Sequence, residues 1–381
     1  MFIDPVDSLL ESRIVELEEI ARNKFLPKRK YYHDNHLMPY DNIDAISSAG
    51  LLNAMLPEKY NGINSNLFSN DPATYLQAIR VIARSCSSTA HMFQVHNHSS
   101  YIINQIGSEY QRDTFLPNDG NLVATVGSEP NRRSMYKFST TAKKVAGGYI
   151  INGEKTYATN GLMLKAAIIM ASDSDTDEVV LLIVTPDQKG IIIDNSWYVP
   201  AGMRSARSPR LLLDNVFVED KNVLGTNDAY VKEKFQAQFH LGFTANYLGT
   251  IEGMFAWFVD YMHNRNKTND PFIQRHTGEM YSDLLAAQNM FHETIRSWKT
   301  KPVTEAEVAS IATKTFVGKT ALNIAQQIVK CAGTQATFET EPLSIYLADL
   351  QTHISHSGHD KSYQIVGQSR LGKKFDTTLQ R

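Results

Sequence analysis

Residues 148–161 read Gly-Tyr-Ile-Ile-Asn-Gly-Glu-Lys-Thr-Tyr-Ala-Thr-Asn-Gly, and the fold is decided around them. The aromatic and β-branched residues at 149–151 lie between Gly147-Gly148 and Asn152-Gly153. This pattern indicates a strand with hairpin-type turns at both ends. Outward from this stretch, the segment 121–225 consists of short β-rich runs broken by turn residues. The other runs are 122–126, 166–170, 179–184 and 211–218. We therefore expect a β-domain in the middle of the chain.

Helical periodicity lies on both sides of this β-rich segment. Before it, apolar residues recur at helical spacing through residues 8–118. After it, the runs that suit bundle-forming helices are 235–265, 272–299, 304–332 and 342–349. This order argues against a doubly wound sheet, in which strands and helices alternate, so we expect an α+β chain. Its expected parts are an N-terminal α-helical domain at 1–119, a middle β-domain at 120–225 and a C-terminal four-helix-bundle domain at 226–381.

Composition excludes several classes of protein. The 381 residues include 38 Lys and Arg and 40 Asp and Glu. The chain therefore lacks the excess of basic residues that nucleic-acid binding requires. Hydrophobic residues make up 42% of the chain, a fraction typical of a folded globular protein and too high for a disordered one. No run of about 18 apolar residues predicts a membrane span, and residues 1–5 lack a signal-peptide pattern. Cys86 and Cys331 are the only cysteines and form no metal-type pair, so a disulfide framework is implausible and we expect a cytoplasmic protein.

Three motifs in a fixed order resemble the acyl-CoA dehydrogenase family of flavoproteins. The first joins Gly127-Ser128-Glu129-Pro130 to the stretch 148–161, similar to the family's T-E-P loop and its G-Y-x-x-N-G-x-K-x-[W/Y]-I-T-N run. The second is Gly202-Met203-Arg204-Ser205, which resembles the segment that closes the family's β-domain. The third runs from Leu248-Gly249 to Asp349 in the C-terminal helices. The resemblance covers nearly the whole chain and implies a middle β-barrel between the two helical domains.

The resemblance implies a flavin cofactor, FAD or FMN. An isoalloxazine ring needs an apolar slot with a few fixed hydrogen-bond donors at its polar edge. By resemblance, Ser128 and Thr159 bring hydroxyl groups to that edge, with Gly127 beside the first of them. Tyr157 would stack against the face of the ring.

The family pattern also implies contacts to the rest of the cofactor across a subunit interface, and with them a homotetramer. Arg265 would contact the diphosphate, because its planar fork grips phosphate bidentately, while Gln274 and Gly333 would help to hold the adenine half. The chain departs from the family here. The spacing from Arg265 to Gln274 is two residues short, and Ala332-Gly333-Thr334-Gln335 replaces the family's G-G-x-G loop. These departures leave FAD and FMN both open.

The acidic base of the dehydrogenases is missing. An acyl-CoA dehydrogenase removes a proton next to the thioester, and it does so with a carboxylate over the flavin. In most of the family this glutamate follows the Asp of an R-D pair by eight residues, which is Ser357 here. A minority carry it at the position of Phe239, which His240 follows. Neither position is acidic, so Ser357 and His240 are predicted to face the substrate instead.

Histidines occupy the neighbourhood of the missing acid. The segment 353–360 contains His353, His356 and His359, and it resembles the flavin-dependent monooxygenase branch of the family. A second cluster at 89–98 contains His91, His96 and His98. Histidine suits proton handling near neutral pH, as oxygen chemistry on a flavin requires. The predicted catalytic residues are His356, His359, His96 and Asn160, the last standing where many members carry a serine. Acidic or cysteine partners at ligand spacing are lacking, so no metal is expected.

The loop after Pro130 adds a hypothesis about the substrate. The dehydrogenases carry small residues there, but this chain reads Asn-Arg-Arg-Ser-Met at 131–135. Arg132 and Arg133, with Ser134, would attract an anionic substrate. A solvated loop is the plain alternative.

Three functional hypotheses follow. The first is a two-component monooxygenase that receives reduced flavin from a separate flavin reductase and passes oxygen to a small aromatic, sulfur or nitrogen centre. The second is an acyl-CoA dehydrogenase that uses an unconventional base. The third is a flavin-fold protein without catalytic activity. The absent glutamate argues against the second, and the flavin-edge residues argue against the third.

Overall fold

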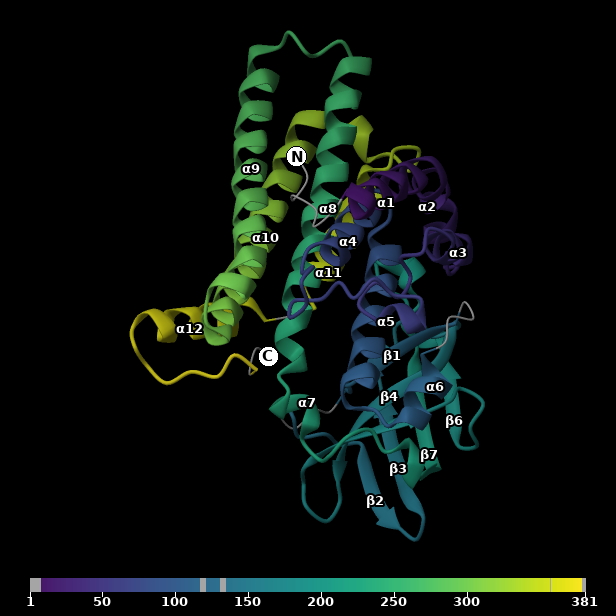
Figure 1. Ribbon diagram of the computed structural model, residues 1–381. Coiled ribbons are helices and arrows are strands. Elements are labelled where there is room, and N and C mark those ends of the chain that lie inside the picture. Colours follow the sequence, from purple (N-terminus) through teal and green to yellow (C-terminus); the bar gives the residue numbers. More distant parts are fainter. Residues whose placement is uncertain (1–7, 117–120, 131–134, 357, 379–381) are drawn as a thin grey trace.

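The computed structural model describes residues 8–116, 121–130, 135–356 and 358–378. In Figure 1 the long helices fill the upper part of the molecule and the sheet lies below them. The two parts meet where helix α5 (Ser87–Ile106) packs against strand β1 (Leu122–Val126). A cavity lies at this junction.

The N-terminal part is helical. Buried polar residues are frequent on α5, which is enclosed along most of its length. Helix α6 begins with a capping box, in which the side chains of Ser108 and Gln111 each accept a hydrogen bond from the other's backbone. Besides α5, the helices and turns of this part are α1 (Ser8–Ile20), a π-helical turn (Ala21–Phe25), α2 (Leu26–Asp34), α3 (Tyr40–Ser48), a 3-10 turn (Glu58–Tyr60), α4 (Thr74–Ser85) and α6 (Glu109–Phe115).

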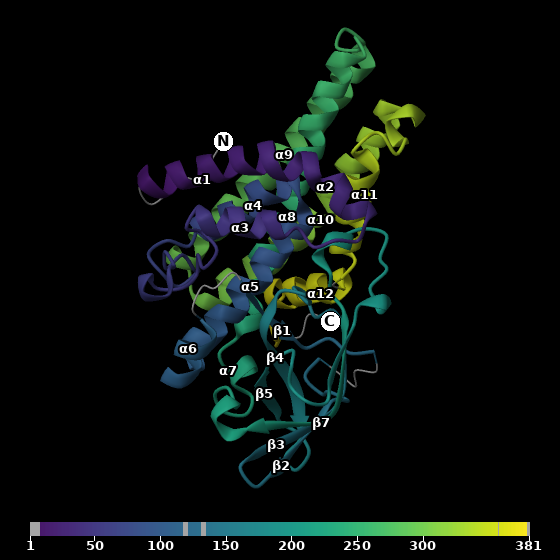
Figure 2. The same ribbon diagram turned by 90° about the vertical axis from the view of Figure 1, so that its right-hand side faces the viewer.

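The middle part is a curled seven-stranded sheet. Its strand order is β1-β4-β2-β3-β7-β6, and β5 pairs with β4 off this path. β1 and β4 run parallel, whereas β3 pairs antiparallel with both β2 and β7. Figure 2 shows the β2–β3 hairpin at the end of the sheet farthest from the helices. The strands after β1 are β2 (Thr141–Val145), β3 (Gly148–Lys155), β4 (Leu164–Asp173), β5 (Val179–Val184), β6 (Ile191–Asp194) and β7 (Arg210–Glu219).

The two predicted turns around β3 have different outcomes. The turn at Gly147 is confirmed, since Val145 pairs with Gly148 and Gly147 has a φ of 78°. The predicted turn at Asn152-Gly153 is wrong, because both residues lie inside β3. The register to β7 shifts between Ile151 and Gly153, so the glycine forms an irregularity within the strand. A Cβ at Gly153 would lie 2.7 Å from the Cα of Thr140, which leaves room for glycine alone.

The C-terminal part is built on three long antiparallel helices. The structure confirms the predicted helical runs here, with ends shifted by a few residues. Glu252 on α8 accepts hydrogen bonds from the guanidinium groups of Arg80 and Arg84 on α4, which joins the C-terminal bundle to the N-terminal helices. The helices are α7 (Ala229–Lys232), α8 (Phe235–Asn264), α9 (Pro271–Thr300), α10 (Val303–Ala332), α11 (Leu343–Ile354) and α12 (His359–Arg370).

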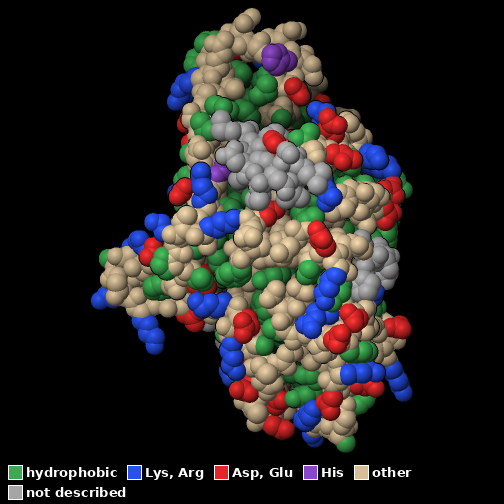
Figure 3. All heavy atoms as spheres, viewed as in Figure 1, with side chains coloured by type: hydrophobic (Ala, Val, Ile, Leu, Met, Phe, Trp, Pro, Cys, Tyr) green, Lys and Arg blue, Asp and Glu red, His purple; other side chains and the backbone are tan. Residues whose placement is uncertain are grey.

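The surface mixes both signs of charge. On the face in Figure 3, Lys and Arg side chains lie among Asp and Glu side chains over the helices and over the sheet. Within the described ranges, no helix combines the length and the apolar content that crossing a bilayer requires.

Candidate active site

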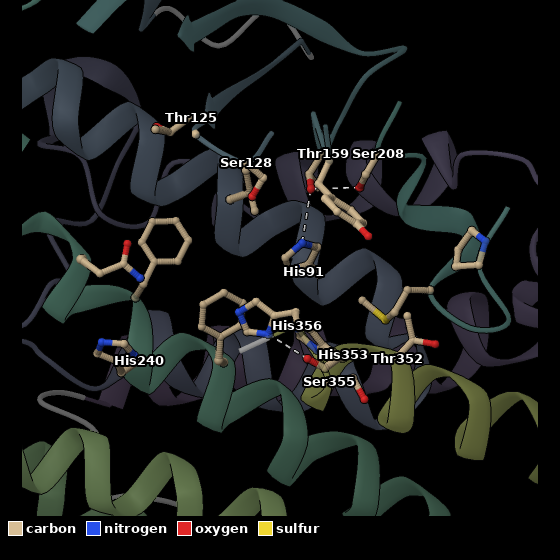
Figure 4. Close-up of a pocket in the computed structure, with 18 of the residues that line it drawn as sticks. His91, Thr125, Ser128, Thr159, Ser208, His240, Thr352, His353, Ser355 and His356 are labelled. Atoms are coloured by element: carbon tan, nitrogen blue, oxygen red, sulfur yellow. Dashed lines mark hydrogen bonds between the residues drawn. The ribbon is translucent and has the colours of Figure 1, made fainter. Parts of the chain in front are cut away.

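A cavity of about 660 Å³ lies where α5, the sheet and the C-terminal helices meet. This volume falls within the usual range for small-molecule sites, roughly 300–1,000 Å³. Figure 4 shows hydroxyl-bearing residues along its sheet side and histidines along its helical side. The described lining residues include four histidines and one lysine, and no Asp or Glu. They are His91, Val95, Thr125, Gly127, Ser128, Met135, Tyr136, Tyr157, Thr159, Met170, Tyr198, Pro200, Met203, Ser208, Tyr230, Gln236, Phe239, His240, Phe243, Lys314, Gln351, Thr352, His353, Ser355 and His356.

The loop after β1 brings Gly127 and Ser128 to the cavity, and a buried ion pair holds it there. The Nζ of Lys155 lies 2.9 Å from Oε2 of Glu129, and both side chains are almost completely buried. Glu129 also accepts hydrogen bonds from the backbone N–H and the hydroxyl of Thr140. Burial alone would raise the pKa of Glu129, but Lys155 and these donors hold it below its usual value. The loop is therefore fixed by a fully engaged carboxylate.

The segment after β3 forms the neighbouring wall. The backbone N–H of Thr156 donates to the carbonyl of Ser128 at 2.8 Å, which ties the two loops together. Tyr157 then adopts a φ of 58° and remains exposed, with its ring 5.0 Å from that of Trp197. The hydroxyl of Thr159 points inward, 3.0 Å from the hydroxyl of Ser208.

Histidines and one phenylalanine from three helices face this wall. His91 comes from α5, and its Nε2 lies 3.3 Å from the hydroxyl of Thr159. The ring of His353, on α11, lies 4.8 Å from the ring of His91. His356 follows α11 and packs on Phe243 of α8 at 4.2 Å between ring centres. Figure 4 shows His91 between the hydroxyl groups and these two histidines.

Burial keeps the inner histidines neutral. It lowers the pKa of His91 to about 4. It also lowers the pKa of His353 well below the usual value, and the nearby His91 and His356 add to that effect. Among the described residues, Nδ1 of His91 and both ring nitrogens of His353 are buried without a hydrogen-bond partner. Unsatisfied buried polar atoms are costly, so these nitrogens are suited to a bound ligand.

Comparison with known proteins identifies the family. Models of the acyl-CoA dehydrogenase N-terminal, middle and C-terminal domains match residues 14–119, 124–216 and 241–361. The chain belongs to the acyl-CoA dehydrogenase family. The predicted family, α+β fold class and oxidoreductase class are thereby confirmed.

Relatives within the family include dehydrogenases and monooxygenases. The chain is 26% identical to mitochondrial isovaleryl-CoA dehydrogenase of Oryza sativa subsp. japonica over 310 residues, which cover 77% of this chain and 73% of the relative. It is 24% identical to dibenzothiophene monooxygenase of Rhodococcus qingshengii over 365 residues, covering 87% and 86%. The structure of dibenzothiophene monooxygenase TdsC from Paenibacillus sp. A11-2 with FMN and indole matches with a TM-score of 0.84 at 20% identity, covering 96% of this chain and 99% of that one. That FMN complex agrees with the prediction of FAD or FMN.

The structure gathers the residues that the family pattern assigns to the flavin ring. Gly127, Ser128, Tyr157 and Thr159 all line the cavity. Ser208 lines it too, and the sequence analysis missed this residue. Its position, three residues after the family motif at 202–205, was the available signal.

Three of the predicted catalytic residues lie outside the cavity lining. The ring nitrogens of His96 contact Oδ1 of Asn53 at 2.8 Å and the backbone N–H of Val123 at 3.1 Å, so this histidine joins helix α5 to the start of the sheet. Asn160 is fully buried, and its amide reaches backbone carbonyls of α5 and β1. Nε2 of His359 lies 3.3 Å from the carbonyl oxygen of Ile354. Of the four predicted residues, His356 lines the cavity.

The residue on α5 that reaches the cavity is His91, which the sequence analysis placed in the right cluster and did not choose. His91 and Val95 are four positions apart on one helix face, and both line the cavity. His96 is five positions from His91 and therefore points to another side of the helix. Of the predicted substrate residues, His240 lines the cavity, while Arg132, Arg133, Ser134 and Ser357 lie outside the described residues.

The residues expected to hold the remainder of the cofactor lie away from this cavity within a single chain. Arg265 follows α8 and donates a hydrogen bond to the side chain of Gln335. Gln274 donates to the carbonyl of Thr268, and Gly333 is the C-cap that follows α10. In Figure 1 the α8–α9 connection forms the far upper end of the bundle. None of these three residues is among the described residues that line the cavity of the same chain. Among the described residues, no group of three or more His, Cys, Asp and Glu is arranged to hold a metal ion.

Met203 of the family motif at 202–205 lines the cavity, and α11 holds this motif in place. The backbone N–H of Met203 donates to Oδ1 of Asp349 at 2.6 Å, and that of Gly202 donates to the hydroxyl of Thr352 at 3.1 Å. A Cβ at Gly202 would lie 2.0 Å from the backbone of Ala348, so the approach requires glycine. Burial raises the pKa of Asp349 to about 6.

Replacing Asp349 with asparagine is expected to change how stability depends on pH. Because the folded pKa lies above the unfolded value, the carboxyl group costs stability as pH rises from about 4 to about 6. Asparagine keeps an oxygen that accepts from Met203 and does not titrate. We expect the stability of wild type relative to D349N to fall by about 2–3 kcal/mol between pH 4 and pH 7.5, measured by urea unfolding. The exposed Asp187→Asn is the control, and a difference that stays constant across this range would contradict the argument.

Proposed function

We propose that the chain is a flavin-dependent monooxygenase, which uses reduced flavin and dioxygen to oxygenate a small aromatic, sulfur-containing or nitrogen-containing substrate. One observation carries the proposal: where a dehydrogenase of this family presents a carboxylate, the described cavity wall presents imidazoles and hydroxyls and no Asp or Glu. The likeness to dibenzothiophene monooxygenase over 87% of the chain supports it.

The residues fit a flavin. The cavity offers aromatic walls, hydroxyl groups on the sheet side and buried ring nitrogens without partners among the described residues, which is the donor set that an isoalloxazine edge requires. Ser128 and Thr159 would hold the polar edge of the ring, and Tyr157 would cover its outer part. A bound reduced flavin would supply two electrons to dioxygen, so that one oxygen atom goes to the substrate and the other leaves as water with two protons.

The side chains of the chain itself have three tasks in this reaction. His91 holds or passes a proton, since its Nε2 contacts the hydroxyl of Thr159 while its Nδ1 has no partner among the described residues. Phe239 and Phe243 cover the helical side with apolar rings and exclude water. His353 and His356 complete the wall and orient the substrate by hydrogen bonds.

The assembly and the electron source are further parts of the proposal. We infer a homotetramer in which Arg265, Gln274 and Gly333 serve the flavin of a neighbouring subunit. The exposed ring of Phe272 lies at the start of α9, and that of Phe338 lies three residues after Gln335, which Arg265 contacts; both support an interface there. A separate flavin reductase would deliver the reduced cofactor. Light scattering after size-exclusion chromatography measures the mass of the assembly, and a monomer at micromolar concentration would exclude this arrangement.

Oxygen reactivity tests the proposed function against dehydrogenation. The protein is loaded with reduced FMN or FAD without air and then mixed with dioxygen, with and without indole, dibenzothiophene or 4-hydroxybenzoate as probes. We expect at least one probe to gain an oxygen atom. In its presence, the amount of hydrogen peroxide released should be lower than without it. Bleaching of the bound oxidised flavin by a panel of acyl-CoAs, with no oxygenated product from any probe, would establish the dehydrogenase instead. Failure to bind either flavin would indicate a protein without catalytic activity.

A further inference from the structure

A lysine is buried in the wall of the cavity. Lys314 lies on α10, is 1% exposed and lines the cavity. Its Nζ lies 3.2 Å from Nδ1 of His240 on α8. Buried lysines are rare because taking an ammonium group out of water is expensive, so a lysine at this place calls for an explanation.

A charged Lys314 would fix the position of the proton on His240. An ammonium group only donates, so with Lys314 charged, Nδ1 of His240 is the acceptor in this contact. Burial, with Lys314 as the next cause, lowers the pKa of His240 well below its usual value and keeps the ring neutral. The proton of the neutral ring is then on Nε2. This Nε2 is buried and has no hydrogen-bond partner among the described residues, although it is a donor.

The pair lies apart from the flavin-edge hydroxyls. In Figure 4, His240 lies at the left of the cavity, whereas Thr159 and Ser208 lie toward the right, with His91 and His356 between. From the same region of α7 and α8, the aromatic side chains of Tyr230, Phe239 and Phe243 line the cavity. Gln236 is the polar residue among the described lining residues of this region. Two polar donors beside aromatic walls, in a described lining without Asp or Glu, form a site for a ring that bears a negative charge.

We propose that Lys314 and His240 bind an anionic oxygen of the substrate, so that the substrate is a small aromatic compound bearing a carboxylate or phenolate group. This inference rests on the proposed function, because it takes the bound compound to be the substrate of that reaction. It adds the charge of the substrate and the residues that select it. The ammonium group supplies the charge, and the Nε2–H of His240 supplies a directed hydrogen bond. Lys314 is a residue that no sequence motif pointed to, because a single lysine in a long helix is ordinarily a surface residue.

Matched pairs of probes test the charge selection by isothermal titration calorimetry on the flavin-loaded protein. Benzoate is compared with benzamide for a carboxylate, and 4-nitrophenolate with nitrobenzene for a phenolate. Because a hydrogen bond to a charged group is among the stronger ones, we expect wild type to bind at least one anion about tenfold or more tightly than its neutral partner. Equal affinities within both pairs would overturn the proposal.

Substitutions then locate the preference. Lys314→Met is expected to abolish it, and Lys314→Arg to retain most of it. The control is Lys319→Met, which removes an exposed lysine from the same helix and is expected to leave the preference unchanged. His240→Phe, which keeps the ring and removes the donor, is expected to weaken anion binding and serves where K314M does not fold. A preference that survives in both K314M and H240F would overturn the assignment of the residues.

Flavin binding is followed separately by fluorescence quenching. If the chain binds no flavin, the proposed function fails, while the same titrations of the chain with benzoate and benzamide still report on Lys314 and His240. If flavin binds and oxygen is transferred but no probe pair shows a preference for the anion, the proposed function stands and the anion site is refuted.

Discussion

Replacing Lys155 with methionine is expected to destabilise the protein by about 3–5 kcal/mol, because it leaves the carboxylate of Glu129 buried without its cation. Both side chains are inaccessible to solvent, at 0% and 1% exposure, so water cannot replace the lost partner. Glu129 would also lose the influence that now keeps its pKa low, and it would take up a proton at a higher pH. Urea unfolding followed by circular dichroism measures the loss.

The same substitution at the surface separates burial from the loss of a lysine as such. Lys143→Met removes an exposed lysine from β2 of the same sheet and is expected to change stability by less than about 0.5 kcal/mol. The double variant Lys155→Met with Glu129→Gln removes the unpaired charge and is expected to recover part of the loss. A K155M protein as stable as K143M would show that the ion pair contributes nothing to the fold.

The site should respond together with the fold. Glu129 follows Ser128 directly, and the carbonyl of Ser128 is tied to the segment that carries Thr159 through the backbone of Thr156. Loss of the ion pair therefore loosens both loops that approach the proposed flavin edge. We expect flavin affinity to fall in K155M, which K143M would not show.

Much of the fold was predictable because its elements are regular in sequence. The runs 235–265, 272–299 and 304–332 correspond to α8, α9 and α10 within a few residues, since long periodic helices leave a strong pattern. The strands β2 and β6 were not predicted, because Thr141–Val145 is mostly polar and exposed and Ile191–Asp194 is very short. Asn152-Gly153 has the composition of a turn, but its neighbours pair on both sides and hold it inside β3.

The candidate site was predictable only where local motifs define it. Gly127, Ser128, Tyr157 and Thr159 follow strand ends in recognisable patterns, and the structure brings all four to one cavity. The histidines were harder, because composition does not tell which side of a helix faces a cavity. Lys314 was missed because its position depends on how α8 and α10 pack, which no pattern near Lys314 encodes.

The largest expected effect on activity is at His91. Replacing His91 with alanine is expected to lower oxygen transfer to a substrate by about 100-fold to 1,000-fold, because a positioned proton donor or acceptor commonly contributes this much. The flavin affinity should change by only a few-fold, since Ser128 and the backbone of the two loops remain. The measurement is the yield of oxygenated product per reduced flavin consumed, with the probe that wild type oxygenates.

Two further variants distinguish proton handling from packing. His91→Gln keeps a polar group that reaches the hydroxyl of Thr159, yet it cannot exchange a proton near neutral pH, so its product yield should remain as low as that of H91A. His96→Ala, on the same helix, removes a histidine that contacts Asn53 and Val123 and should instead lower the stability of the fold. Because burial holds the pKa of His91 near 4, no step from this residue is expected in the product yield between pH 6 and pH 8. A full product yield in H91Q would mean that His91 only positions Thr159, and a full yield in H91A together with a low yield in stable H96A protein would return the catalytic role to His96.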